Sequence, residues 1–141
     1  MNAYARSADA YLTQRVMGAS PEQLAAIIME AGQLHLGRAV QALERNDAAA
    51  ATSSFIRITE VIKEANFLLN LEEGGELAMN LQRLYRWWMK ETMLASRAKD
   101  TNRLAAVAQA MGDLRQTWEQ YHVQKVGATR VSTFQLGDQV G

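Results

Sequence analysis

The sequence predicts an all-α protein: an antiparallel four-helix bundle with an N-terminal arm and a flexible C-terminal tail. The one proline of the chain, Pro21, stands where the first long helical pattern begins. Proline inside a helix costs about 3 kcal/mol, so its absence after Pro21 permits long helices. Apolar residues also recur every three or four positions over four segments, with short turn signals between them. Four helices joined by short connections are typical of an up-down bundle.

The first predicted helix begins at Pro21. Ser20 can accept a hydrogen bond from a free backbone N–H, Pro21 suits the first helical position, and Gln23 completes a capping box. The apolar pattern then continues to Leu43. Asn46-Asp47 is expected to end this helix and to cap the next one.

The second predicted helix has more apolar surface than one seam requires. Its main stripe is Phe55, Ile58, Ile62, Ala65 and Leu69. Ile56, Val61 and Leu68 point away from that stripe and widen the apolar face. The segment Leu71-Glu72-Glu73-Gly74-Gly75 is the strongest break in the chain, because paired glycines allow a tight reversal.

The third predicted helix starts at about Glu76, and the fourth follows the turn Lys99-Asp100-Thr101. The main face of the third consists of Leu77, Leu81, Leu84, Trp88 and Ala95. Tyr85, Met89 and Met93 extend its apolar side, and Trp87 cannot share a direction with Trp88. The fourth helix carries Leu104, Val107, Met111, Leu114, Trp118 and Tyr121 at the same spacing.

These elements form one predicted domain, residues 1–125, which includes the arm 1–19. Residues 126–141 lack a helical period and are expected to form the flexible tail. No run approaches the ~20 apolar residues of a membrane span, and the N-terminus lacks the apolar stretch of a secretory signal. The chain has no cysteine, which suits a reducing compartment. We therefore expect a cytoplasmic protein that does not insert into membranes.

The charges balance, with 15 Lys and Arg against 15 Asp and Glu. Such a chain has no overall field to attract nucleic acid, so we expect recognition through shape and apolar contact. Lys90, Arg97, Lys99 and Arg103 form a modest basic cluster. Because Glu91 and Asp100 are interleaved with it, a solvated face is favoured over a nucleic-acid site.

Helical bundles can hold carboxylate-bridged metals, so a metal-dependent enzyme is one rival interpretation. Glu119 precedes His122 by three residues, as such sites require, but Gly32 occupies the matching position before His35. Half of the motif is therefore missing, and His122 is better explained as a partner of a helix C-terminus. There is no phosphate-binding loop of the Gly-x-x-x-x-Gly-Lys type either. We expect no enzyme activity, no cofactor and no metal.

The surplus apolar surface indicates a protein partner. The extra breadth falls on two neighbouring helices, and exposed apolar patches usually bind something. A helix laid into a groove is the natural mode for such a surface, and the seven methionines suit a surface that adapts to its partner. A structural or adaptor bundle that buries this surface as a homodimer is the second rival.

Several ordered motifs resemble the FliS-type flagellin export chaperones over about residues 11–118. The resemblance begins with Tyr11 and Val16 and continues through Ala19-Ser20-Pro21-Glu22-Gln23-Leu24. Its strongest part is Leu71-Glu72-Glu73-Gly74-Gly75-Glu76-Leu77-Ala78-Met79-Asn80-Leu81, followed by Leu84-Tyr85. It ends with Ala95, Asp100, Leu104, Val107 and Leu114-Arg115-x-x-Trp118. Met29-Glu30-Ala31, Trp87 and Thr92 depart from the family pattern.

The resemblance implies a cytoplasmic chaperone that binds the disordered C-terminal segment of flagellin in apolar grooves. Such a protein prevents premature polymerisation and delivers its cargo to the flagellar type III export gate. Its arm, including Tyr11, would then be tied to release of the groove and to the gate component. The predicted partner-binding residues are Tyr11, Val16, Ile56, Val61, Leu68, Tyr85, Trp87 and Met89. The first two follow from the motif, and the other six from helical-face geometry.

Overall fold

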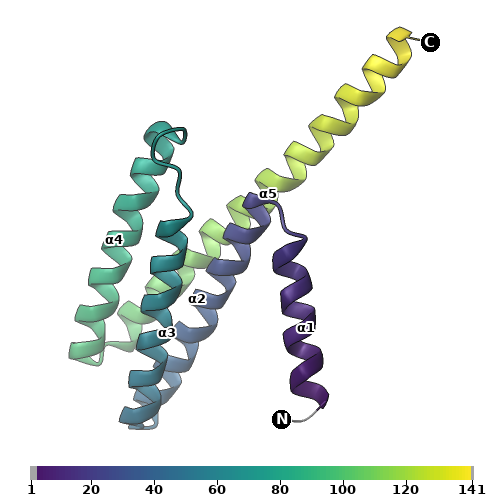
Figure 1. Cartoon of the computed structure of the whole chain (residues 1–141). Helices are drawn as coiled ribbons and strands as arrows, with labels where there is room; N and C mark the ends of the chain where they lie inside the picture. The colour runs from purple at the N-terminus through teal and green to yellow at the C-terminus, as the bar shows by residue number, and fades with distance from the viewer. Residues whose placement is uncertain (1–2, 141) are drawn as a thin grey trace.

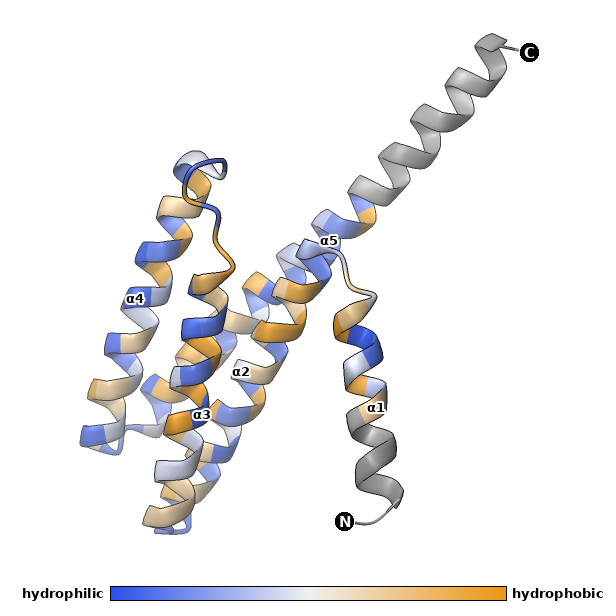
Figure 2. Ribbon diagram, viewed as in Figure 1, coloured by the Kyte–Doolittle hydropathy of each residue, from blue (hydrophilic) through white to orange (hydrophobic). Residues whose placement is uncertain are grey.

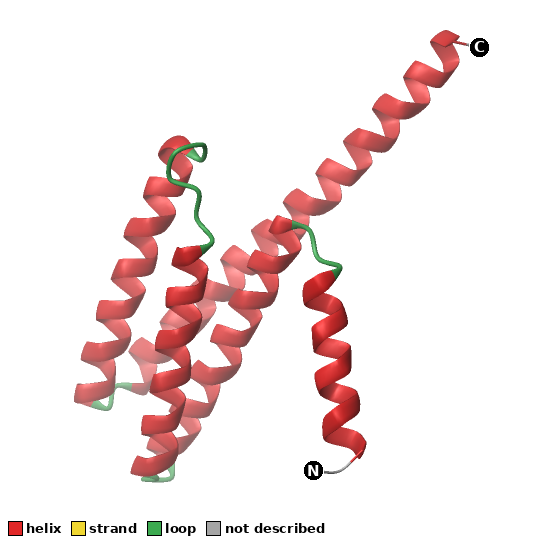
Figure 3. Cartoon of the chain, viewed as in Figure 1, coloured by secondary structure: helices red, strands yellow, loops and turns green. Residues whose placement is uncertain are grey.

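The computed structural model describes the backbone of residues 3–140 and the side chains of residues 10–124. Within that part of the chain there are five helices and no strand (Figure 3). The helices are α1 (Ala3–Met17), α2 (Pro21–Glu44), α3 (Ala48–Phe67), α4 (Gly75–Ala98) and α5 (Thr101–Val140). The predicted all-α class is confirmed.

Short polar segments begin three of the helices. The Ser20 hydroxyl accepts from the Gln23 N–H, and the Gln23 side chain accepts from the Ser20 N–H at 2.9 Å, which completes the predicted capping box. Asp47 accepts from the Ala50 N–H at the start of α3. Asp100 accepts from the Arg103 N–H at the start of α5 in the same way. These side chains satisfy N–H groups that have no partner inside the helix.

The start of α4 depends on backbone conformation instead of a polar cap. Gly74 makes no side-chain cap, and Gly75 has φ +56°. Only glycine enters this left-handed region without a steric cost, because it lacks a Cβ. The paired glycines predicted as a reversal therefore form one.

Helices α2 to α5 share one core, and consecutive helices run in opposite directions (Figure 1). α2 packs closely against both α3 and α5, whereas α4 approaches α3 and α5 less closely. Small residues line the close contacts of α2, among them Gly32, Ala39 and Ala42. α4 instead inserts Tyr85 and Trp88, and bulky contact residues hold helices further apart. This difference in spacing opens space beside α4.

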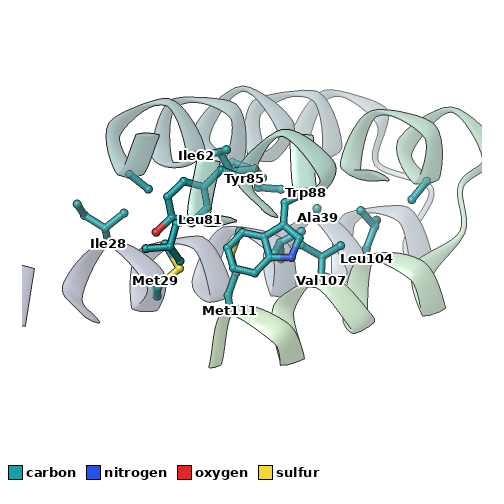
Figure 4. Packing of buried hydrophobic residues seen from close by; sticks show 14 residues of the cluster. Ile28, Met29, Ala39, Ile62, Leu81, Tyr85, Trp88, Leu104, Val107 and Met111 are labelled. Carbon is teal, nitrogen blue, oxygen red and sulfur yellow. The ribbon is translucent and has the colours of Figure 1, made fainter. Parts of the chain in front are cut away.

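The core is centred on Trp88, which is 1% exposed. Figure 4 shows its ring among Ala39, Leu104, Val107 and Met111. The Tyr85 ring lies 5.6 Å from it, centroid to centroid, at a tilt of 36°. Fully buried side chains thus come from all four helices of the body, as the predicted seams require.

The helix after residue 101 is longer than the sequence predicts. α5 continues to Val140, so residues 126–140 are helical where a non-helical tail was expected. Extending a helix that already exists needs no new nucleus, and Gly127 and Gly137 weaken it by only about 1 kcal/mol each. The predicted domain end at residue 125 stays a prediction, because the side chains beyond residue 124 lie outside the described residues.

The longer helix also corrects the interpretation of His122. This residue lies in the middle of α5, not near its C-terminus. Its Nδ1 is 3.0 Å from the Ser20 hydroxyl, so it ties α5 to the residue that caps α2.

Candidate partner-binding surface

A cavity opens at the end of the body where α3 gives way to α4. Its volume is about 420 Å³, and its walls come from α2, α3, α4 and Trp118 of α5. The apolar wall residues are Leu24, Ala25, Ile28, Met29, Ala65, Leu68, Leu69, Leu77, Ala78, Leu81, Tyr85 and Trp118. Such a lining accepts apolar side chains and offers few polar groups to orient a small substrate.

The rim of this cavity exposes large apolar side chains. Leu68 and Leu77 line it and are 46% and 60% exposed. Phe67, the last residue of α3, and Leu71, in the segment between α3 and α4, are exposed as well. Figure 2 shows hydrophobic residues at the end of α3 and in the loop before α4. An exposed apolar rim around an apolar cavity is the pattern of a protein-binding site.

Two titratable groups lie in the wall. Burial raises the pKa of Tyr85 to about 12, so its phenol is neutral at physiological pH. Glu22 is 9% exposed and is the one charged residue among the described groups that line the cavity. An occupant therefore meets a largely neutral surface, and apolar contact dominates its binding.

The arm helix α1 lies beside α2, and its described residues make few close contacts with the body (Figure 1). Arg15 forms an ion pair with Glu30 at 3.1 Å. A gap of about 380 Å³ remains between the end of α1, the start of α2 and Glu119 of α5. The apolar side chains Tyr11, Leu12, Val16 and Met17 are exposed. The described part of α1 thus presents apolar surface without burying it.

The structure brings only some of the predicted partner-binding residues together. Leu68 and Tyr85 meet at the cavity, although Tyr85 is 3% exposed and belongs to the core. Met89 lines a different groove, between α3 and α4. Tyr11 and Val16 are exposed on the arm.

The remaining three lie on separate faces. Ile56 and Trp87 are exposed, on α3 and α4 respectively. Val61 is half-buried against the core, since it faces Gly32 of α2 instead of solvent. The groove residues inferred from helical faces therefore do not form one continuous groove, and their binding role stays a prediction.

Sequence reasoning found Leu68 and Tyr85 but missed other residues that line the cavity. Leu77, Leu81 and Trp118 were assigned to the faces that pack between helices, where apolar spacing alone puts them. Leu77 lies in the first turn after the paired glycines. This position was the signal that could have identified Leu77 as a rim residue and not a core residue. A helix that starts at a loop exposes its first turn.

Two polar contacts hold the body outside the cavity. Arg103 of α5 makes a bidentate pair with Glu91 of α4, at 2.7 and 3.0 Å. The hydrogen bonds from Arg103 lower the pKa of Glu91. On α2, burial and then the charges of Arg38 and Arg57 lower the pKa of His35.

Neither metal-ligand clusters nor membrane helices are found in the described region. No three acidic or histidine side chains among those described lie close enough to hold a metal ion. Likewise, none of the described helices combines the length and apolar character needed to cross a bilayer.

Comparison with known proteins gives one consistent family. The model of the family described as "Flagellar protein FliS" matches residues 3–125. Three curated relatives are each named a flagellar secretion chaperone: FliS of Salmonella typhimurium, FliSB of Pseudomonas aeruginosa and FliS of Bacillus subtilis.

These relatives are similar to the chain over most of their length. The Salmonella protein is 28% identical over 106 residues, which cover 74% of this chain and 78% of its own. The Pseudomonas protein is 29% identical over 105 residues, covering 74% and 83%. The Bacillus protein is 28% identical over 111 residues, covering 79% and 82%.

Proposed function

The chain belongs to the FliS family of flagellar proteins, and from that premise we propose that it is a flagellar export chaperone without enzyme activity. Its cargo would be the disordered C-terminal segment of flagellin, held in the cytoplasm before export. The observation that carries the proposal is the apolar cavity with its exposed rim at Leu68 and Leu77. A protein whose relatives are secretion chaperones has a use for such a surface.

The energetics favour a holding function. Ordering a disordered segment costs about 2–5 kcal/mol or more. Burying one large apolar side chain returns about 1.5–3 kcal/mol, so a few side chains in the cavity offset that cost. No chemical step is needed, and the bound segment cannot join a growing polymer while it is held.

The arm supports the delivery step of the proposal. Tyr11 and Val16 are exposed on a helix that is attached by few contacts. We expect these side chains to contact either the cavity rim or the export gate component, depending on whether cargo is bound. The second contact would bring the loaded chaperone to the gate.

The test is binding of purified flagellin with and without its C-terminal segment. We expect the full-length flagellin to bind and the truncated flagellin not to bind. In the chaperone, Leu77→Asp should weaken binding at least tenfold, which is about 1.4 kcal/mol, because it puts a charge into the apolar rim. Leu34→Asp is the matched control: Leu34 is 52% exposed on α2 and does not line the cavity.

Two results would count against the proposal. Equal recovery of both flagellins would remove the C-terminal segment as the cargo. A chaperone mass that corresponds to a dimer, unchanged by flagellin, would favour the homodimeric adaptor instead.

A further inference from the structure

A second groove, between α3 and α4, is bordered by basic side chains, which the cavity lacks. Its volume is about 580 Å³. Phe55 and Thr59 of α3 form one wall, and Met89 and Met93 of α4 form the other. Arg86, Lys90 and Arg97 also line it, and each is exposed. The groove thus combines an apolar floor with a positively charged border.

The charge in this groove is not neutralised within the described residues. The described lining contains no carboxylate. Arg86, Lys90 and Arg97 take part in none of the ion pairs found among the described side chains. Glu91, which interrupts this basic cluster in the sequence, pairs with Arg103 on the α5 side of α4. Folding therefore separates Glu91 from the basic residues of the groove. The sequence analysis had interpreted these interleaved charges as a solvated face.

A buried polar atom in the groove also lacks a partner. Thr92 lines the groove, is 4% exposed, and its hydroxyl makes no hydrogen bond to any described group. Natural proteins seldom leave a buried hydroxyl unpaired, because desolvation is costly.

We propose that this groove binds an acidic amphipathic helix of another protein, as a second site distinct from the cavity. The charge of the occupant follows from Arg86, Lys90 and Arg97, since opposite charges steer association and fix register. Its apolar face follows from Phe55, Met89 and Met93, and methionine side chains mould to a helix laid against them. Nucleic acid fits less well, because a phosphate backbone gains nothing from that floor.

The chain's own terminal segments do not suit the groove. Residues 1–19 contain two arginines and one aspartate, and residues 125–141 contain one lysine, one arginine and one aspartate. Neither segment therefore carries the net negative side-chain charge that the groove favours. An acidic segment of another protein matches the groove better.

The experiment uses the full-length protein and two synthetic helical peptides, followed by fluorescence anisotropy. The first peptide carries leucine and methionine on one face and glutamate on the other, and the second replaces every glutamate by lysine. We expect the acidic peptide alone to bind. Its affinity should fall at least tenfold between about 50 and about 300 mM salt, since screening shortens the reach of the charges.

Two matched double variants locate the site. Lys90→Glu with Arg97→Glu should weaken the acidic peptide at least tenfold. Arg38→Glu with Arg45→Glu makes the same charge change at the same seven-residue spacing, on α2 and at its C-cap, and should change affinity less than twofold.

Three outcomes would overturn the inference. If both double variants lose the same peptide affinity, the binding depends on the net charge of the protein and not on this groove. Tighter binding of a single-stranded oligonucleotide or of phosphatidylserine vesicles than of the acidic peptide would assign the groove to another class of ligand. Displacement of the peptide by the flagellin C-terminal segment would make the groove part of the cargo site, whereas simultaneous binding supports a second site.

Discussion

Gly32 shows how a single residue sets the spacing of two helices. A Cβ built at Gly32 would lie 2.5 Å from the Met111 sulfur and 3.4 Å from a methyl carbon of Val61. Met111 is fully buried, so its sulfur would have to shift within a packed core. The absence of a side chain therefore lets α2 and α5 approach closely at this point.

Gly32→Ala should lower the free energy of unfolding by about 1–3 kcal/mol, because overpacking outweighs the gain in helix propensity of about 1 kcal/mol. Gly112→Ala is the control: its new Cβ would meet only the end of the Gln33 side chain, which can move away. Chemical denaturation of both variants measures the difference. If the two variants are equally stable, the close approach of α2 and α5 does not depend on the missing side chain at Gly32.

His35 gives the folded protein a pH dependence in the mildly acidic range. Burial and then Arg38 and Arg57 lower its pKa below the usual 6.5. Below pH 6.5 the unfolded chain takes up this proton first, so stability falls with decreasing pH until the folded imidazole is protonated as well. His35→Gln should make unfolding free energy less sensitive to pH between about 7 and 5.

Denaturation curves at several pH values check this effect. The pair between Glu91 and Arg103 provides the internal comparison, since Glu91 has its pKa lowered below 4.5. Its stabilising contribution is present above that pH and is lost only as pH falls through the folded pKa, so Glu91→Gln should leave the slope between pH 7 and 5 unchanged.

At the scale of elements, the arm is the least supported helix. Among its described residues, Arg15 forms an exposed ion pair with Glu30 of α2, and Tyr11, Leu12, Val16 and Met17 stay largely exposed. Exposed ion pairs contribute about 0–1 kcal/mol. A variant that lacks residues 1–17 should therefore unfold with a free energy within about 1 kcal/mol of the full chain. A larger loss, measured by the same denaturation assay, would mean that α1 is part of the core.

Element boundaries were predictable where a local side chain determines them. Ser20, Asp47 and Asp100 cap helices through hydrogen bonds three residues along the chain, so the sequence alone reveals them. The end of α5 was not predictable in this way, because no proline or cap marks it. The helical backbone of residues 126–140 was not predicted because a missing apolar period does not by itself exclude a helix, and the flexibility of this tail stays a prediction.

At the scale of the whole molecule, the core could be predicted from the sequence and the cavity could not. Apolar periodicity correctly assigned Ile58, Trp88 and Met111 to the interior, because inward direction depends only on position along each helix. The cavity depends on the distance between helices, which is set by pairs of side chains from different segments. Small residues allow α2 to pack closely against its neighbours, whereas Trp88 keeps α4 further from them. The apolar pattern of a single helix does not reveal this difference in distance.

The cavity also predicts that stability and cargo binding oppose each other in this molecule. Ala25 is half-buried on α2 and lines the cavity, so Ala25→Leu would fill part of the empty space with three more carbons. At about 0.8 kcal/mol per buried CH₂, full burial of three carbons would give about 2.4 kcal/mol, and because the site is half-buried the free energy of unfolding should rise by about 1–2 kcal/mol. The same side chain would take the place of flagellin, and its affinity should fall about tenfold. Natural binding sites commonly retain such a cost in stability.

Ala49→Leu is the matched control for this pair of effects, because Ala49 is exposed near the start of α3, away from the cavity. It should leave both unfolding and flagellin binding unchanged. Measured together, the two variants separate filled space from added hydrophobicity. If Ala25→Leu stabilises the protein and still binds flagellin as tightly as before, the cavity is a packing defect and the cargo lies elsewhere on the body. If it weakens flagellin without lowering stability, the space beside α4 is the part of the fold that the function requires.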